Sequence, residues 1–128
     1  MLLFDTNIVS YLMRGDPLRD HYFQFYEEFA TAISFMTVAE LHEGALRANW
    51  GERRMRFLEE EIARYVVYPA SQEVIQLWAE IRTARRREPI SAQDAFIAAT
   101  ALAHSCPLVT HNPKDFRGIV GLKVISAV

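Results

Sequence analysis

The chain has 128 residues, 51% of them hydrophobic and 23% charged, which is the composition of a soluble globular domain. We therefore expect one domain, residues 1–128, with a core that needs neither a disulfide nor a structural metal. No stretch approaches the roughly 20 apolar residues that span a bilayer, and no basic segment precedes the apolar start, which argues against a secretory signal. With a single cysteine, Cys106, the sequence predicts a cytoplasmic protein with no membrane contact.

The formal net charge of −2 argues against a generic nucleic-acid binder, which would carry a basic surface. The basic residues are unevenly placed, however, because arginines cluster shortly before Ile90, at positions 82, 85, 86 and 87. Only Lys114 and Lys123 among the 14 basic residues are lysine, a bias that suits bidentate contacts with phosphate or carboxylate. Two interpretations remain open: cations that complement a helix macrodipole, or a contact with an anionic substrate or an acidic segment of a partner.

Short apolar runs alternate with helical periodicity along the chain. The runs predict strands at residues 1–5, 32–35, 65–68, 108–110 and 122–125. The periodicity, first interrupted at Gly15-Asp16-Pro17, predicts helices over residues 7–13, 17–30, 37–49, 51–64, 71–87 and 92–104. One face of the segment 17–30 carries aromatic side chains that we expect in the core: Tyr22, Phe25, Tyr26 and Phe29. The alternation predicts an α/β fold, with a central, mostly parallel sheet of four to five short strands and helices on both faces.

Acidic residues stand where these strands end and where helices begin. Asp5 ends the first strand, Glu40 follows the second, Asp94 opens the helix over 92–104, and Asp115 follows the fourth strand. Because ligands of open α/β sheets bind beyond the carboxyl ends of the strands, we expect the four carboxylates to converge there. Carboxylates that share a crevice raise one another's pKa, and Mg²⁺ or Mn²⁺ relieves this repulsion. Such ions serve phosphodiester cleavage, so the pattern favours phosphate chemistry.

Other roles for these acids stay open. Thr37 to Glu40 and Ser91 to Asp94 both have the spacing of a capping box, in which hydroxyl and acid satisfy free helical N–H groups. In a non-catalytic interaction domain the acids would have only this role, and their replacement by alanine would cost about 0.5–2 kcal/mol of stability without changing metal affinity. A phosphatase with Asp5 as nucleophile is the other alternative. It would want a second acid two residues further on, where this chain has asparagine.

Four segments, taken in order, resemble the motifs of PIN domains and, more narrowly, of the VapC-type toxins of bacterial and archaeal toxin–antitoxin pairs. They are Asp5-Thr6-Asn7, Thr37-Val38-Ala39-Glu40, Asp94-Ala95-Phe96-Ile97-Ala98-Ala99 and Val109-Thr110-His111-Asn112-Pro113-Lys114-Asp115-Phe116. The resemblance covers nearly the whole chain. No single motif is specific, but four in this order on the expected elements are.

Carried over residue by residue, the resemblance implies a metal site with Asp5, Glu40 and Asp94 at the three most regular acidic positions. Both Asn112 and Asp115 are available for the fourth position, and we choose Asp115 as the acid. The supporting residues would orient these acids by hydrogen bonds; they are Thr6, Asn7, Thr110 and Asn112.

The resemblance also implies an activity and its partners. It implies a Mg²⁺- or Mn²⁺-dependent endoribonuclease in which a metal-activated water attacks a phosphodiester bond of single-stranded or looped RNA, such as a tRNA or ribosomal RNA. It further implies the toxin of a type II pair, held inactive by a cognate antitoxin, and a homodimer. We expect the antitoxin at the aromatic stripe of residues 22–29 or along the helix of residues 37–50.

Overall fold

Five short strands form one sheet in the computed structural model, which describes residues 1–128. The strands are β1 (Leu2–Phe4), β2 (Thr31–Ser34), β3 (Val66–Tyr68), β4 (Leu108–Val109) and β5 (Val124–Ile125). Their order in the sheet is β3-β2-β1-β4-β5, and every neighbouring pair is parallel. The predicted α/β fold is confirmed, with five strands and a sheet that is parallel throughout.

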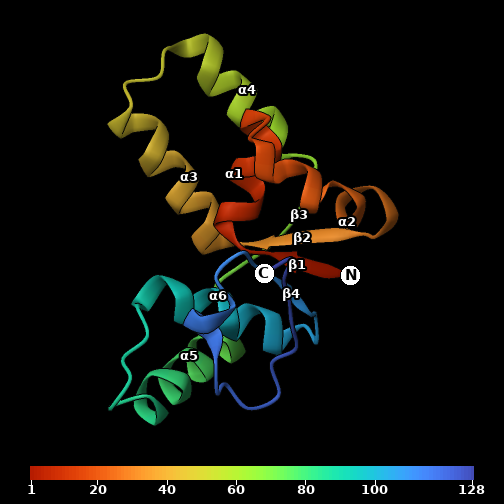
Figure 1. Cartoon of the computed structure of the whole chain (residues 1–128). Helices are drawn as coiled ribbons and strands as arrows, with labels where there is room; N and C mark the ends of the chain where they lie inside the picture. Colours follow the sequence, from red (N-terminus) through yellow and green to blue (C-terminus); the bar gives the residue numbers. More distant parts are fainter.

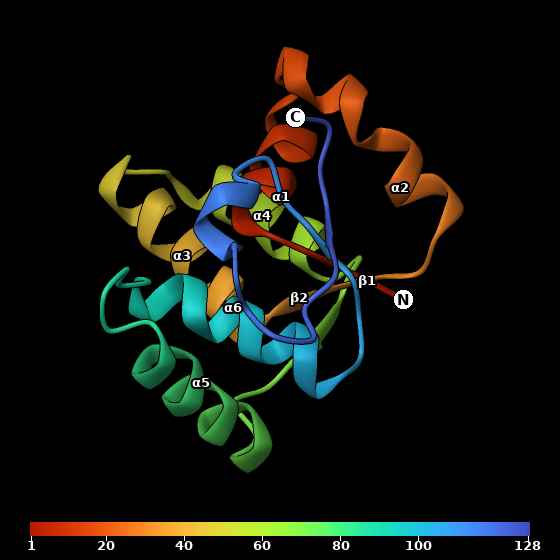
Figure 2. The same cartoon turned by 60° about the horizontal axis from the view of Figure 1, so that its bottom comes forward.

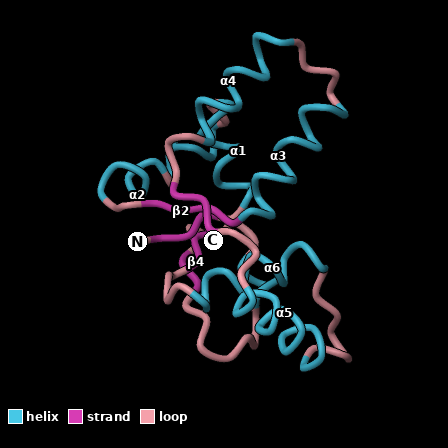
Figure 3. The backbone as a smooth tube through the Cα atoms, turned by 180° about the vertical axis from the view of Figure 1, so that it is seen from behind, coloured by secondary structure: helices cyan, strands magenta, loops and turns pink.

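Six α-helices and two short 3₁₀-helices connect the strands: α1 (Thr6–Arg14), η1 (Pro17–His21), α2 (Phe23–Glu28), α3 (Phe35–Arg47), α4 (Glu52–Ile62), α5 (Gln72–Ala84), α6 (Ala92–Ala103) and η2 (Pro113–Phe116). Helices α1 to α4 cover one face of the sheet, and α5 and α6 cover the other (Figure 1). Seen from behind, the strands form a central layer between these two groups (Figure 3). None of the helices has the length and apolar character needed to cross a bilayer.

Two predicted elements differ from the structure. The helix expected over 17–30 is two helices: η1, capped by the side chain of Asp16, and α2, separated from it at Tyr22, whose φ of −123° is not helical. The second strand ends at Ser34, because the Ser34 side chain accepts a hydrogen bond from the N–H of Met36 and caps α3. Helix α3 therefore begins two residues earlier than predicted.

The hydrophobic core has two halves, one on each face of the sheet. Because side chains alternate along a strand, Leu3 packs with α5 and α6, whereas Leu2 and Phe4 pack on the side of α1. Helix α6 lies across the sheet (Figure 2) and buries small side chains in this half of the core, among them Ala95, Ala98 and Ala99. The aromatic stripe is only partly core: Tyr22 is fully buried, but Phe29 is 48% exposed.

The sheet order places the end of β1 between the ends of β2 and β4. Asp5 follows β1, α3 begins directly after β2, and Thr110 follows β4. The first turn of α6 lies at the same edge, because α6 runs back across the sheet to reach the start of β4 (Figure 1). Polar groups from four separate segments therefore meet at the carboxyl edge of the sheet.

Candidate active site

Asp5 is the most enclosed carboxylate at this edge, with 7% of its surface exposed. Its Oδ2 accepts a hydrogen bond of 2.7 Å from the Thr110 hydroxyl, and its Oδ1 accepts one of 2.8 Å from the N–H of Thr6. Burial raises the pKa of Asp5 to about 6; the two hydrogen bonds oppose this shift, and the carboxylates of Asp94 and Glu40 add to it. Asp5, the N-cap of α1, is thus held in one orientation in a place where its charged form is disfavoured.

Glu40, on α3, is held by a pair of threonines. The Thr6 hydroxyl donates to Glu40 Oε1 at 2.8 Å and lies 2.9 Å from the Thr37 hydroxyl. Because a hydroxyl has one hydrogen, Thr37 is the donor in the second bond. Burial raises the pKa of Glu40, the bond from Thr6 opposes this, and the carboxylates of Asp94 and Glu43 raise the pKa further.

Asp94 reaches the same edge from the other face of the sheet, half-buried in the first turn of α6. Burial raises its pKa, the carboxylate of Asp115 raises it further, and a hydrogen bond with Ser91 opposes the shift. The charge of Asp94 in turn raises the pKa of Asp5 and Glu40. The structure therefore brings the carboxylates from β1, α3 and α6 within electrostatic reach of one another.

The capping interpretation holds for one of its two segments. Ser91 caps α6, since its Oγ accepts a hydrogen bond of 3.0 Å from the N–H of Asp94. Thr37 is not a cap, because Ser34 occupies that position and Thr37 lies within the first turn of α3. There its fully buried hydroxyl donates a hydrogen bond to the Thr6 hydroxyl instead. The capping box predicted from Thr37 is therefore wrong.

The fourth position of the expected metal site, for which Asp115 and Asn112 are the candidates, lies at the rim of the three carboxylates. Asp115, on η2, and Asn112 just before it are both exposed. The Asp115 carboxylate acts on Asp94. The side chain of Asn112 makes no hydrogen bond, but its main-chain N–H donates to the Thr110 hydroxyl at 3.1 Å and so orients Thr110 toward Asp5. Of the two candidates, Asp115 is the one coupled to another acid of the group.

The donor set suits a hard divalent cation. The side-chain oxygen of Asn7, two residues after Asp5, is the only buried side-chain nitrogen or oxygen without a hydrogen-bond partner, and such an acceptor suits a hydrated ion. No three His, Cys, Asp or Glu side chains stand close enough together to hold an ion by themselves. Mg²⁺, however, usually takes only one or two carboxylates and completes its coordination with water and phosphate oxygens. The residues therefore fit an ion of this kind.

Two contacts near the site have partners that the sequence does not indicate. The Nδ1 of His111 lies 2.6 Å from the Tyr22 hydroxyl, and the histidine ring meets the rings of Tyr11 and Tyr22 edge-on. Arg85, at the end of α5, donates to the main-chain carbonyl of Asp115 at 3.0 Å. The partners are far apart in the chain, so no local spacing could have revealed them.

Comparison with known proteins agrees with this geometry. A family model described as PIN domain matches residues 2–122, and the chain belongs to this family. Ribonuclease VapC1 of Haemophilus influenzae (strain R2866) is 33% identical over 125 residues, which cover 94% of this chain and 93% of that protein. Ribonuclease VapC1 of Rickettsia felis is 33% identical over 133 residues, which cover 98% and 95%. Within the PIN-domain family, the chain therefore belongs with the VapC ribonucleases.

Solved structures share the fold over their full length. VapBC-1 from nontypeable Haemophilus influenzae superimposes with a TM-score of 0.85 at 27% identity, over 98% of this chain and 96% of that chain. VapBC2 from Rickettsia felis, solved bound to a DNA fragment from its promoter, gives 0.84 at 25% identity over 99% and 98%. A toxin–antitoxin complex from Klebsiella pneumoniae gives 0.75 at 32% identity over 98% and 96%. The resemblance expected from the four motifs is confirmed.

Proposed function

We propose that this protein is a Mg²⁺- or Mn²⁺-dependent endoribonuclease and the toxin of a type II toxin–antitoxin pair. The observation that carries the proposal is the group of carboxylates of Asp5, Glu40 and Asp94 at one edge of a parallel sheet, where the charge of Asp94 acts on the other two. Family membership supports it, since the similar proteins are named ribonucleases. Both oxygens of the enclosed Asp5 are engaged in hydrogen bonds, which does not favour the phosphatase alternative with Asp5 as nucleophile.

The acids of the site would hold the cation, with the last of them at the rim: Asp5, Glu40, Asp94 and Asp115. A bound Mg²⁺ or Mn²⁺ supplies Lewis acidity toward phosphate oxygens and lowers the pKa of water. Thr110 and the N–H of Thr6 keep Asp5 from rotating. The Thr6 hydroxyl fixes Oε1 of Glu40 and leaves Oε2 without a hydrogen bond, available to a ligand. No side chain has to act as a nucleophile.

Expression of the chain without an antitoxin tests the nuclease activity. RNA is extracted shortly after induction and its 5′ ends are mapped by sequencing, beside the same cells making Asp5→Ala. We expect new ends at a few positions in tRNA or ribosomal RNA, and none from the variant. Equal sets of ends from the two proteins would show that the nuclease hypothesis is wrong.

Calorimetric titration of Mn²⁺ tests metal dependence separately. We expect binding to the wild type, and binding weaker by about tenfold or more to Asp5→Ala, Glu40→Ala and Asp94→Ala. Glu60→Ala is the matched control, because Glu60 is exposed on α4 and its charge acts on none of these three acids. Unchanged affinity in all three site variants would favour the interaction domain, whose acids are only helix caps.

A groove beside Glu40 suits the antitoxin. It lies between α1, α3 and α4 and has a volume of about 620 Å³. Thr6 and Glu40 line one end, so a segment that fills the groove also reaches the acids. Half of the lining is apolar: Met13, Leu41, Ala45, Ala48, Trp50 and Phe57. We therefore propose that the antitoxin binds along α3 and not at the aromatic stripe, whose Tyr22 is fully buried.

Filling the groove tests this assignment. Gly44 lines it, and a Cβ added there meets nothing within 4 Å, so we expect Gly44→Trp to fold with its indole in the groove. We expect this variant to lose co-purification with a co-expressed antitoxin and to keep Mn²⁺ binding. Ala79→Trp, exposed on α5 at the other face, is the matched control and should keep both. Full antitoxin binding by Gly44→Trp would show that the antitoxin does not bind in this groove.

The same resemblance supports a homodimer located in the cytoplasm. Size-exclusion chromatography with light scattering should give twice the mass of one chain for the metal-free protein. A single-chain mass over the micromolar range would rule the homodimer out.

A further inference from the structure

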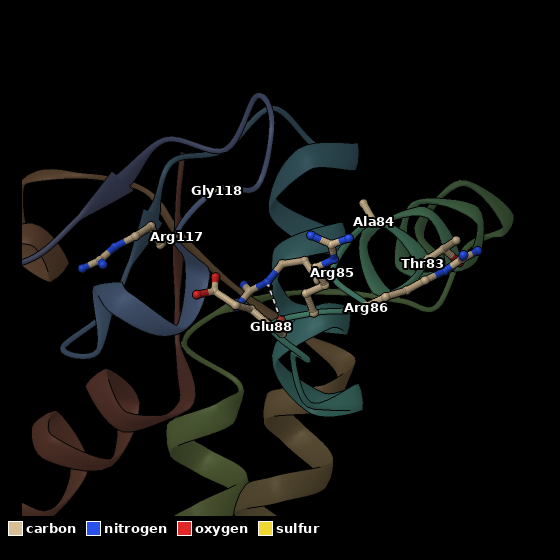
Figure 4. Close-up of a pocket in the computed structure, with 8 residues that line it drawn as sticks. Thr83, Ala84, Arg85, Arg86, Glu88, Arg117 and Gly118 are labelled. Atoms are coloured by element: carbon tan, nitrogen blue, oxygen red, sulfur yellow. Dashed lines mark hydrogen bonds between the residues drawn. The ribbon is translucent and has the colours of Figure 1, made fainter.

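A second pocket lies at the same end of the molecule as the acids and is basic. It has a volume of about 540 Å³ and lies between the end of α5 and the turn that follows η2. Four arginines and one glutamate are among its eight lining residues: Arg85, Arg86, Arg87, Arg117 and Glu88. In Figure 4, Arg85 stands between Arg86 and Arg117, whose side chains extend to opposite sides.

The arginines of this pocket have no carboxylate partners. The molecule contains two ion pairs, Arg47 with Glu43 and Arg64 with Glu61, and neither is in the pocket. With a net charge of −2 the chain has enough acids to neutralise its cations. A concave cluster of unpaired arginines in such a protein is a site of positive potential that attracts anions.

Arg85 is held in a fixed orientation. Its Nε donates to the main-chain carbonyl of Glu88 at 3.0 Å, and its Nη1 donates to that of Asp115 at 3.0 Å. Both acceptors are main-chain oxygens, so the guanidinium keeps its full charge and its remaining N–H groups. The same bond joins the pocket to the segment of Asp115, which acts on the Asp94 carboxylate. The basic pocket and the acidic site are therefore direct neighbours.

Helix capping does not account for this cluster. Cations near the end of a helix complement its macrodipole, and the effect is confined to the last turn. Arg85 is already the C-cap of α5, Arg86 and Arg87 lie beyond it, and Arg117 comes from a different part of the chain. The pocket needs another explanation.

We infer that this pocket binds backbone phosphates of the RNA strand next to the phosphate that is cleaved, an assignment that rests on the proposed nuclease function. Four acids at the site repel a polyanion, so the attraction that holds a strand there has to come from nearby cations. The arginine fork matches phosphate oxygens bidentately. An acidic protein segment in this pocket would also be repelled by Asp94 and Asp115. Unlike an RNA strand that is being cleaved, it would have no reason to bind beside these acids.

A pair of matched charge removals tests the inference. Arg86→Gln/Arg117→Gln removes two exposed pocket arginines, and Arg53→Gln/Arg56→Gln removes two exposed arginines of α4. Both pairs are made in an Asp5→Asn background with EDTA, so that the RNA stays intact. Binding of a fluorescein-labelled single-stranded RNA of mixed sequence is followed by anisotropy from 50 to 200 mM KCl. Arg85 is left unchanged because it also joins the two segments.

We expect the pocket pair to weaken RNA binding about tenfold at 50 mM KCl and to reduce the slope of log Kd against log salt by about 1.4, at about 0.7 for each lost contact with a single strand. The control pair should stay within about twofold, with an unchanged slope. With Asp5 restored, the pocket pair should raise KM for RNA cleavage and keep kcat.

The outcomes separate this inference from the proposed function. Equal loss of RNA affinity in both pairs overturns the pocket assignment even if the wild type cleaves RNA. A wild type that cleaves nothing, with RNA binding that still depends on the pocket pair, overturns the nuclease and keeps the pocket. The same proteins are titrated with labelled oligo-glutamate. If the pocket pair weakens only that binding, the pocket takes an acidic protein segment and the RNA assignment is wrong.

Discussion

Single residues of the site are held by hydroxyl groups and not by counter-charges. Thr110 fixes Asp5 and Thr6 fixes Glu40, while no basic side chain lies within ion-pair distance of either acid. The hydrogen bonds from the Thr110 hydroxyl and the Thr6 N–H oppose the effect of burial only in part, so the pKa of Asp5 stays at about 6. A cation can therefore enter without displacing a protein cation first.

The raised pKa of Asp5 makes folding stability fall as the pH rises. The unfolded chain releases this proton near pH 3.8 and the folded chain near pH 6, so the contribution is fully present below pH 3.8 and is lost on the way to pH 6. At about 1.4 kcal/mol per pKa unit this amounts to about 3 kcal/mol. We expect Asp5→Asn to raise the free energy of unfolding at pH 7 by about 1–3 kcal/mol, because asparagine is neutral and similar in shape, and to abolish cleavage.

Urea unfolding in EDTA at pH 4 and pH 7 checks this expectation. The gain of Asp5→Asn should be present at pH 7 and nearly absent at pH 4. Thr110→Val is the informative control, since it removes the hydroxyl that donates to Asp5 and should lower stability at pH 7 by about 1–2 kcal/mol. A variant Asp5→Asn less stable than the wild type at pH 7 would mean that burial does not dominate the pKa.

At the scale of elements, Ser34 joins the two helices that carry Glu40 and Asp94. Its Oγ accepts a hydrogen bond of 3.0 Å from the N–H of Met36 and so starts α3. Its Oγ also lies 3.3 Å from the Thr100 hydroxyl of α6, on the other face of the sheet, and Thr100 donates its one hydrogen to the Phe96 carbonyl at 2.7 Å. A fully buried serine thus sets the position of α3 relative to α6.

Ser34→Ala should lower both stability and cleavage. The lost cap and the lost contact with Thr100, whose hydroxyl keeps its bond to the Phe96 carbonyl, together should cost about 1–2 kcal/mol. Because α3 can then shift against α6, we expect kcat/KM for RNA cleavage to fall about threefold to tenfold, measured below the unfolding temperature. Ser71→Ala removes an equivalent cap from α5, a bond of 3.2 Å to Val74, and should lower stability alone. Equal activities of the two variants would contradict the link.

For the whole molecule, Tyr22 ties three distant segments together. Its hydroxyl lies 2.6 Å from Nδ1 of His111, after β4, and accepts a hydrogen bond of 3.2 Å from the N–H of Ala127, near the end of the chain. The tyrosine is fully buried, and both of these contacts are partly buried. The end of the chain, β5 and the loop beside the acids are thereby anchored to the segment before α2.

Tyr22→Phe should therefore lower the free energy of unfolding by about 1–2 kcal/mol, since two partly buried polar groups lose their hydrogen-bond partner. Tyr11→Phe is the matched control, because Tyr11 stacks on Tyr22 and meets His111 edge-on, but its hydroxyl makes no hydrogen bond. Urea unfolding of both variants is the measurement. Hydrogen exchange should also become faster at residues 124–128 in Tyr22→Phe only. Equal destabilisation would show that only the rings matter.

The sequence predicted the secondary structure closely where local signals are strong. Gly15 ends α1 with a φ of 65°, as the turn cluster indicated, and Ser91 begins α6 as its spacing predicted. Its errors fell where two nearby residues compete for one role. Ser34 and Thr37 could each cap α3, and only the packing of Thr37 against Thr6 shows which does so. The break between η1 and α2 falls at Tyr22, a buried residue that contacts His111, 89 positions further along the chain.

By itself the sequence determined that a parallel α/β sheet would gather acids at its carboxyl edge. Strand and helix periodicity, and the order of the short acidic motifs along the chain, can be read directly from the sequence. Only the tertiary structure decided which groups act on those acids: the threonine hydroxyls at Asp5 and Glu40, the rim position of Asp115, and the arginine pocket beside it. Burial and contacts between residues up to 105 positions apart set these relations, and no local pattern encodes them.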